Sequence, residues 1–206
     1  TLSSGFLRYE HGAARGFGWY AGLGHAQRMP DYWELFSADT FGSGMASMGG
    51  PNTFAGVAPE KTTQLDVGAQ VRSARASAWV SAYAGRIDDF ILFTYRSGGM
   101  MGTTSSVANI DARIHGAEAG AEFRPDADWT LGGTLAWAWG TNASAGTPLP
   151  QMTPFEARLT AAHEGERWSG GALLRIVAAQ DRIAIDQGNV SGRDLGPSSG
   201  FATLSV

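Results

Sequence analysis

The chain has 206 residues, of which 43% are hydrophobic and 17% charged, a composition expected of a folded protein and not of a disordered segment. Fifteen basic residues against 19 acidic ones give a formal net charge of -4, which provides no basic surface for nucleic acid. Cysteine is absent, so disulfides, zinc-thiolate sites and a thiol nucleophile are excluded.

Alternation of apolar and polar residues predicts β-strands along most of the chain. In residues 64–72, positions such as Leu65 and Val67 are apolar, whereas the intervening Asp66 and Arg72 are polar. No segment reaches the roughly 18 consecutive apolar residues of a transmembrane helix. Nine strands are predicted, near residues 2–10, 16–28, 62–73, 76–93, 107–123, 129–140, 154–163, 167–181 and 200–206.

Very short and long connections alternate between these strands. The short ones are residues 12–15, 73–75, 124–128 and 164–166, and the long ones are 29–61, 94–106, 141–153 and 182–199. In an antiparallel meander this alternation puts every long loop at one end of the sheet. Within the first long loop, residues 30–36 predict a short helix, because Pro30 suits an early helical position and acidic residues follow near its amino end.

Tight turns at one rim and long loops at the other are typical of an outer-membrane β-barrel. Trp19, Trp129 and Trp168 fall near short-turn ends, whereas Trp137 and Trp139 fall near a long-loop end. Two aromatic girdles at the membrane surfaces would have this distribution. A soluble β-sandwich with these tryptophans in its core is the alternative.

Several segments resemble the signature of TonB-dependent outer-membrane receptors. Residues 28–36 read Arg-Met-Pro-Asp-Tyr-Trp-Glu-Leu-Phe, and Pro59 and Glu60 open the next predicted strand. In that family an Arg-x-Pro-x-x-x-Glu-Leu segment ends one barrel strand and a Pro-Glu pair begins the next. The Gly-Ala-Glu step at 116–118 and the Pro-initiated segment at 153–158 resemble later strands. Segments 86–91, 149–152 and 177–182 are most similar to the family's copper receptor branch.

The resemblance implies an all-β, antiparallel transmembrane β-barrel of about 22 strands. Residues 1–206 are then expected to form a partial β-barrel domain, about nine strands of the whole, and the plug domain that fills such barrels is not recognisable in the sequence. The chain is therefore expected to be a fragment of a longer receptor in the bacterial outer membrane.

The resemblance also implies a function, namely uptake of copper across the outer membrane. Energy would come from the TonB, ExbB and ExbD complex acting through the plug, and the barrel would contact outer-membrane lipid. Copper is expected as the transported substrate, with no organic cofactor and no enzymatic activity. Two alternatives stay open: a receptor for a ferric siderophore or another metal chelate, and a structural or adhesive β-domain without transport activity.

Methionines supply the candidate metal ligands. All six lie in or beside predicted long loops, and Met45, Met48, Met100 and Met101 are predicted to capture copper at the outer mouth. A thioether is a soft ligand that suits Cu(I). The alternative is that these side chains fill irregular loop cores. The resemblance does not assign any of the family's copper ligands to a particular residue of this chain.

Other polar residues receive structural predictions. The four histidines, His11, His25, His115 and His163, have no metal-ligand spacing, and only His25 and His115 lie on the long-loop side, where they are expected to approach the methionines. Asp88 and Asp89 are expected to end a strand and start a loop. Six charged residues are predicted to line the barrel interior and to form ion pairs between neighbouring strands: Asp66, Arg72, Glu118, Glu122, Arg158 and Arg175.

Overall fold

One antiparallel β-sheet dominates the computed structural model, which describes residues 2–12, 16–37, 52–53, 56–97, 103–188 and 196–206. Its strand order is β1-β2-β5-β6-β7-β8-β10-β11-β12, with the short β9 paired to β8. The long strands are β1 (Gly5–His11), β2 (Phe17–Arg28), β5 (Glu60–Arg72), β6 (Ala76–Ser97), β7 (Thr103–Phe123), β8 (Trp129–Asn142), β10 (Glu156–Glu164), β11 (Ser169–Val177) and β12 (Phe201–Ser205). The short elements are α1 (Tyr32–Leu35), β3 (Phe36–Ser37), β4 (Asn52–Thr53) and β9 (Thr147–Pro148).

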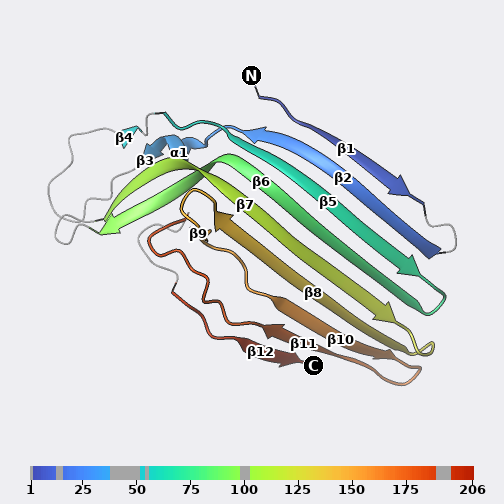
Figure 1. The fold of residues 1–206 in the computed structure, drawn as a ribbon. Coiled ribbons are helices and arrows are strands. Elements are labelled where there is room, and N and C mark those ends of the chain that lie inside the picture. The colour runs from blue at the N-terminus through green and yellow to red at the C-terminus, as the bar shows by residue number, and fades with distance from the viewer. Residues whose placement is uncertain (1, 13–15, 38–51, 54–55, 98–102, 189–195) are drawn as a thin grey trace.

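The sheet is the predicted meander. Each of the nine predicted strands corresponds to one long strand, and each long strand pairs with the next one along the chain. The turns β5–β6, β7–β8 and β10–β11 lie together at one end, whereas α1 and β9 lie at the other (Figure 1). The all-β antiparallel prediction is confirmed, and α1 falls within the predicted helix.

Two strands, β6 and β7, extend furthest beyond their predicted bounds. β6 and β7 pair as far as Ser97 opposite Thr103, so the described ends of the predicted loop at 94–106 are strand. The Thr-Thr-Ser-Ser sequence at 103–106 indicated a loop, but backbone pairing between the two strands continues through it. In contrast, β11 ends at Val177, before the predicted residue 181.

The expectation that Asp88 and Asp89 start a loop is wrong. Both lie within β6 at a β-bulge, where the pairing shifts between Ile87 and Phe90. Asp89 adopts a φ of 60°, and its backbone carbonyl accepts a hydrogen bond from Asn109 Nδ2 at 2.6 Å. Its carboxylate pairs with Lys61 Nζ at 2.6 Å. Bulges look like strand ends in a sequence because they interrupt the alternation.

One face of the sheet is apolar and open to its surroundings. The register places Leu7, Leu23, Leu65 and Ala84 in one row across four strands. Leu7 is 77% exposed, Leu23 55% and Leu65 49%, although apolar side chains of this size are normally buried in soluble proteins. A large exposed apolar surface marks contact with another apolar phase or partner. This face therefore has the character of a lipid-contacting barrel wall.

The described residues form a single layer with a small core at its long-loop end. Ile87, Ala112 and Leu149 are buried, and Phe90 and Met152 are among the side chains that pack against them. A β-sandwich requires a second sheet of comparable size, but the other sheet in the described part of the chain is the two-stranded β3–β4 pair. No helix among these residues is long and apolar enough to cross a membrane.

Candidate functional site

The face opposite the apolar one carries the charged residues that were predicted to line the interior. Arg72 lies opposite Ser77, which lies opposite Glu122, so this row stays on one face across β5, β6 and β7. The same register places the remaining predicted residues on this polar face: Asp66, Glu118, Arg158 and Arg175. The prediction of a shared charged face is confirmed.

Ion pairing on the polar face centres on Glu156, which sequence analysis did not single out. Arg158 and Arg175 lie directly opposite each other on β10 and β11. Glu156 accepts hydrogen bonds from Arg175 Nε at 3.0 Å and Nη2 at 2.7 Å, and from Arg158 Nε at 2.6 Å. One carboxylate thus compensates two like charges that would otherwise repel. Its signal in the sequence was its position two residues before Arg158, on the same face.

The other predicted charges do not form ion pairs between strands among the described residues. Asp66 accepts a hydrogen bond from Gln64 Nε2 at 2.8 Å, and Glu122 pairs with Arg124 at 2.9 Å, both along one strand direction. The side chains of Glu118 and Arg72 have no hydrogen bond or ion pair to any residue that the structure describes. Their charges face the space in front of the sheet, where another part of the protein or solvent must meet them.

Aromatic rings on the polar face lie flat against the sheet because glycines stand beside them. Trp79 lies opposite Gly120, Tyr83 opposite Gly116 and Tyr20 opposite Gly68. A Cβ atom at Gly120 would lie 2.5 Å from Trp79 Nε1, so the ring occupies the space that a side chain would take. The rings therefore cover backbone instead of projecting from the wall.

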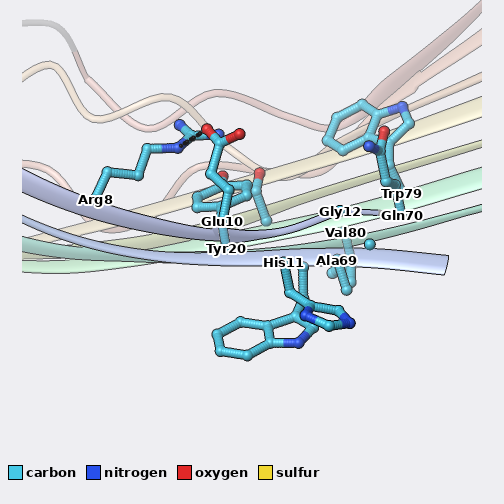
Figure 2. Close-up of a pocket in the computed structure, with 12 residues that line it drawn as sticks. Arg8, Glu10, His11, Gly12, Tyr20, Ala69, Gln70, Trp79 and Val80 are labelled. Carbon is cyan, nitrogen blue, oxygen red and sulfur yellow. Dashed lines mark ion pairs between the residues drawn. The ribbon is translucent and has the colours of Figure 1, made fainter. Parts of the chain in front are cut away.

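A hollow of about 410 Å³ lies against β1, β2, β5 and β6 on this face. Figure 2 shows Arg8, Glu10, Tyr20 and Trp79 on one side of the strands and His11 on the other. Arg8 Nε contacts Glu10 Oε1 at 2.6 Å, and its guanidinium carbon lies 3.9 Å from the centre of the Tyr20 ring. The hollow offers hydrogen-bonding and aromatic groups, which suit binding, but no nucleophile beside a base.

The long-loop rim is organised around Arg28, the last residue of β2. Its guanidinium binds Glu34 of α1 through two parallel contacts of 2.8 Å, and its Nε contacts Glu60 of β5 at 2.8 Å. Glu60 in turn accepts the backbone N–H of Ile91 in β6 at 2.8 Å. Paired fork contacts of this kind are among the stronger hydrogen bonds in proteins.

The same arrangement explains why the helix begins where it does. Glu34 accepts the backbone N–H of Asp31 at 2.7 Å, and Asp31 accepts the N–H of Glu34 at 2.9 Å, a reciprocal cap at the start of α1. Glu34 is only 6% exposed, so its charge depends on Arg28. The Arg-x-Pro-x-x-x-Glu-Leu segment and the Pro-Glu pair therefore form one clamp that joins three strands and a helix.

A second contact ties the segment after β11 to this rim. The Arg182 guanidinium lies over the Trp139 ring, 2.9 Å from its centre, and Nη2 donates to the Gly140 carbonyl at 3.1 Å. Burial lowers the pKa of Arg182 below its usual value. Further along, the Gly188 N–H donates to the Phe93 carbonyl at 3.0 Å. The segment thus contacts β8 through Arg182 and the long-loop end of β6 through Gly188.

The four predicted copper ligands, Met45, Met48, Met100 and Met101, lie outside the described residues. Met29 is 57% exposed at the rim, whereas Met152 packs against the core cluster. No group of three or more His, Asp or Glu side chains in the described part of the chain is placed to hold a metal ion.

The histidines expected near these methionines lie on the apolar face. His115 contacts Trp137 and Trp139, with ring centres 5.4 and 6.3 Å away. His25 Nδ1 lies 3.0 Å from Thr63 Oγ1. Their contacts are those of residues at a membrane boundary, where aromatic and amphipathic side chains gather.

One sequence match to a catalytic motif has a different structure from the motif. Residues 196–200 read Gly-Pro-Ser-Ser-Gly, but a nucleophile elbow joins a strand to a helix. Here the segment leads into β12, and Ser198 forms an isolated bridge with Gln180. The segment is a strand entrance.

Comparison with known proteins gives a consistent result. The family model described as "TonB dependent receptor-like, beta-barrel" matches residues 1–206. The solved structure of the copper transporter OprC is 49% identical, with a TM-score of 0.87, and the match covers 98% of this chain and 30% of that one. No curated protein matches.

More distant structures share the fold. The FrpB iron transporter from Neisseria meningitidis is 14% identical with a TM-score of 0.66, covering 98% of this chain and 30% of that chain. A variant of the ferric enterobactin receptor PfeA from Pseudomonas aeruginosa is 15% identical with a TM-score of 0.70, covering 98% and 31%. The chain thus spans about a third of these proteins' length. With a two-faced meander and a family match over all its residues, the chain belongs to the TonB-dependent receptor family and forms part of its β-barrel.

Proposed function

We propose that this chain is part of the barrel wall of a receptor that takes up copper across the outer membrane. The observation that carries the proposal is the 49% identity to the copper transporter OprC over 98% of the chain. The iron transporters of the same fold are 14–15% identical, which supports a common fold and no common substrate. Barrels of this family lie in the bacterial outer membrane.

The remaining parts of the proposal follow from the family's dependence on TonB. Residues 1–206 form one partial barrel domain whose apolar face contacts lipid and whose polar face lines the interior. The receptor receives energy from the TonB, ExbB and ExbD complex, which acts through a plug held in the barrel. The barrel wall itself does no covalent chemistry.

Loop methionines are proposed to capture the metal at the outer mouth. Met45, Met48, Met100 and Met101 supply soft thioether sulfur that needs no deprotonation and suits Cu(I). The two pairs belong to segments that leave the same rim, one after β3 and one between β6 and β7. The first segment follows α1, which Arg28 holds, and the second follows β6, which Glu60 of the same clamp contacts.

The experiment is elemental analysis of the full-length receptor, purified from outer membranes of cells supplied with both copper and iron. The proposal expects about one copper per chain, as for a single occupied site. Iron held with an organic chelate, and no copper, would show that the substrate is a metal chelate.

A variant series then tests the methionines separately. Replacing Met45, Met48, Met100 and Met101 together by Leu should weaken copper binding by the full receptor at least about ten-fold, since Leu keeps the volume but removes sulfur. Met29→Leu is the matched control, because Met29 is exposed at the same rim. Unchanged copper affinity in the four-fold variant would refute the loop ligands and leave copper uptake standing.

A further inference from the structure

A cleft of about 390 Å³ lies at the short-turn end of the sheet, where β5 turns into β6 beside the end of β7. Its polar lining consists of Arg72, Ser73, Arg75, Ser77, Glu122 and Arg124. Nothing in the proposed copper uptake uses these residues, which lie at the opposite end of the strands from the long loops.

Backbone hydrogen bonds hold the cleft in shape. The Ser73 N–H donates to the Ala76 carbonyl at 2.7 Å, which closes the turn, and the Ala76 N–H donates to Ser73 Oγ at 3.1 Å. The Arg124 N–H donates to the Arg75 carbonyl at 2.7 Å, which fixes the turn to β7. The backbone that carries the arginines is therefore ordered before any ligand binds, which lowers the entropic cost of binding.

The charges in the cleft do not balance. Arg124 pairs with Glu122, at 2.9 Å between Nη2 and Oε1. Among the described residues, the Arg75 side chain donates only to the Pro125 carbonyl, at 3.4 Å, and the Arg72 side chain has no polar partner. Asp126 lies nearby in sequence, but its carboxylate accepts the N–H groups of Asp128 and Trp129.

The one glutamate of the cleft lining is paired with Arg124, so the charges of Arg72 and Arg75 have no carboxylate partner in the described part of the chain, although the chain as a whole has a net charge of -4. Guanidinium groups bind carboxylates and phosphates through paired hydrogen bonds, and the serine hydroxyls add further donors. Charge complementarity thus indicates an anionic partner.

The face on which the cleft opens identifies the kind of anion. Arg72, Ser77 and Glu122 form one row of the polar face, whereas the adjacent Val71 and Phe123 belong to the apolar face. The cleft opens toward the barrel interior and not toward lipid. Short turns of outer-membrane barrels lie on the periplasmic side. We propose that this cleft binds an acidic polypeptide segment, carrying at least two carboxylates, at the periplasmic mouth of the barrel.

The test uses the complete receptor in its own outer membrane. A photoreactive p-benzoylphenylalanine replaces Ala74, a cleft residue without charge, and adducts formed on illumination are identified by mass spectrometry. The expected adduct is a polypeptide stretch with two or more Asp or Glu residues within about six positions. In an Arg72→Gln, Arg75→Gln background its yield should fall at least about ten-fold, since glutamine keeps hydrogen-bonding capacity but removes both charges that pair with carboxylates.

Arg167→Gln is the matched control, because Arg167 is an exposed arginine in the turn between β10 and β11 and is not part of the cleft. It should leave the adduct yield unchanged. The proposal is overturned by adducts on phospholipid, by adducts on a polypeptide without carboxylates, or by no adduct. An equal yield from the Arg72→Gln, Arg75→Gln background overturns it as well. Circular dichroism of each variant shows that the barrel is folded, as expected for changes to exposed side chains.

Discussion

Arg28 connects more of the rim than any other single side chain described above. Its guanidinium contacts Glu34 of α1 and Glu60 of β5, and Glu60 binds the backbone of Ile91 in β6. Glu34 and Glu60 are nearly buried, so water cannot take the place of Arg28 as the partner of either carboxylate at low cost. The entry to the first long loop is therefore fixed by one charged group.

Replacing Arg28 should release the helix that it holds. Arg28→Ala leaves Glu34 buried without a cation, a change that costs about 3 kcal/mol when a buried pair loses one partner. Amide hydrogen exchange of residues 31–35 in the full receptor should become about 100-fold faster. Arg86→Ala is the control, because Arg86 pairs with Asp88 and Asp111 on the exposed surface, where ion pairs contribute little. Equal exchange in the two variants would show that Arg28 does not hold α1.

Arg182 makes a contact that is local in space and distant in sequence. The cation lies on the Trp139 ring and donates to the Gly140 carbonyl, 42 residues away. Arg182→Met keeps most of the side-chain volume but removes the charge and the donors, and should destabilise the segment by about 1–2 kcal/mol. Faster hydrogen exchange at the Gly188 amide, which donates to Phe93, is the expected readout. Exchange as slow as in the native protein would mean that Arg182 is dispensable for this attachment.

At the level of strands, the sequence predicted what depends on alternation and missed what depends on pairing. The nine long strands were predictable because each keeps one apolar and one polar face for at least several residues. The bulge at Asp88 and Asp89 was not predictable in this way, because the hydrogen bond from Asn109 to the Asp89 carbonyl forms only when β6 and β7 pair. Glu156 was missed for the same reason, since its role follows from Arg175 lying opposite Arg158.

The aromatic–glycine pairs of β2 with β5 and of β6 with β7 lead to a prediction at this scale. Gly120→Ala puts a methyl group where Trp79 lies, so the ring must leave the wall, at a cost of about 1–3 kcal/mol as for other overpacked sites. Gly24→Ala is the control, since a Cβ there meets no atom within 4 Å. The free energy of unfolding of the receptor in detergent, measured by denaturant titration, should fall for Gly120→Ala alone. Equal values for both would show that the ring adapts without cost.

The whole molecule is a curved wall with two chemically different surfaces. Its apolar face exposes large side chains on nearly every strand, and its buried core is confined to a few residues at the long-loop end. The sequence predicted this division of faces. Its assignment of Met45, Met48, Met100 and Met101 as metal ligands stays a prediction, because these residues belong to 38–51 and 98–102, outside the described part of the chain.

A fold with this surface should depend on amphiphile. Produced as residues 1–206 alone, the chain should aggregate in aqueous buffer and acquire β-structure only in detergent micelles or lipid, because exposed apolar area of this extent is not tolerated in water. Circular dichroism and gel filtration with and without detergent measure both properties. A monomeric, folded chain in detergent-free buffer would contradict the lipid-facing assignment of the apolar surface.

The bulge in β6 shifts the alternation of side chains between the two faces of its hairpin. Between the pairs Ile87–Ala112 and Phe90–Ile110, β6 uses one residue more than β7, so Phe90 returns to the face that Ile87 occupies. A β6 that kept the same residues but paired regularly with β7, without the bulge, would turn Phe90 and each residue beyond it to the opposite face. The bulge thereby reverses which sequence positions share a face: odd-numbered residues such as Ile87 lie on the polar face before it, and even-numbered residues such as Phe90 lie there after it. A residue of β6 can therefore be assigned to a face from the sequence only when its position relative to the bulge is known.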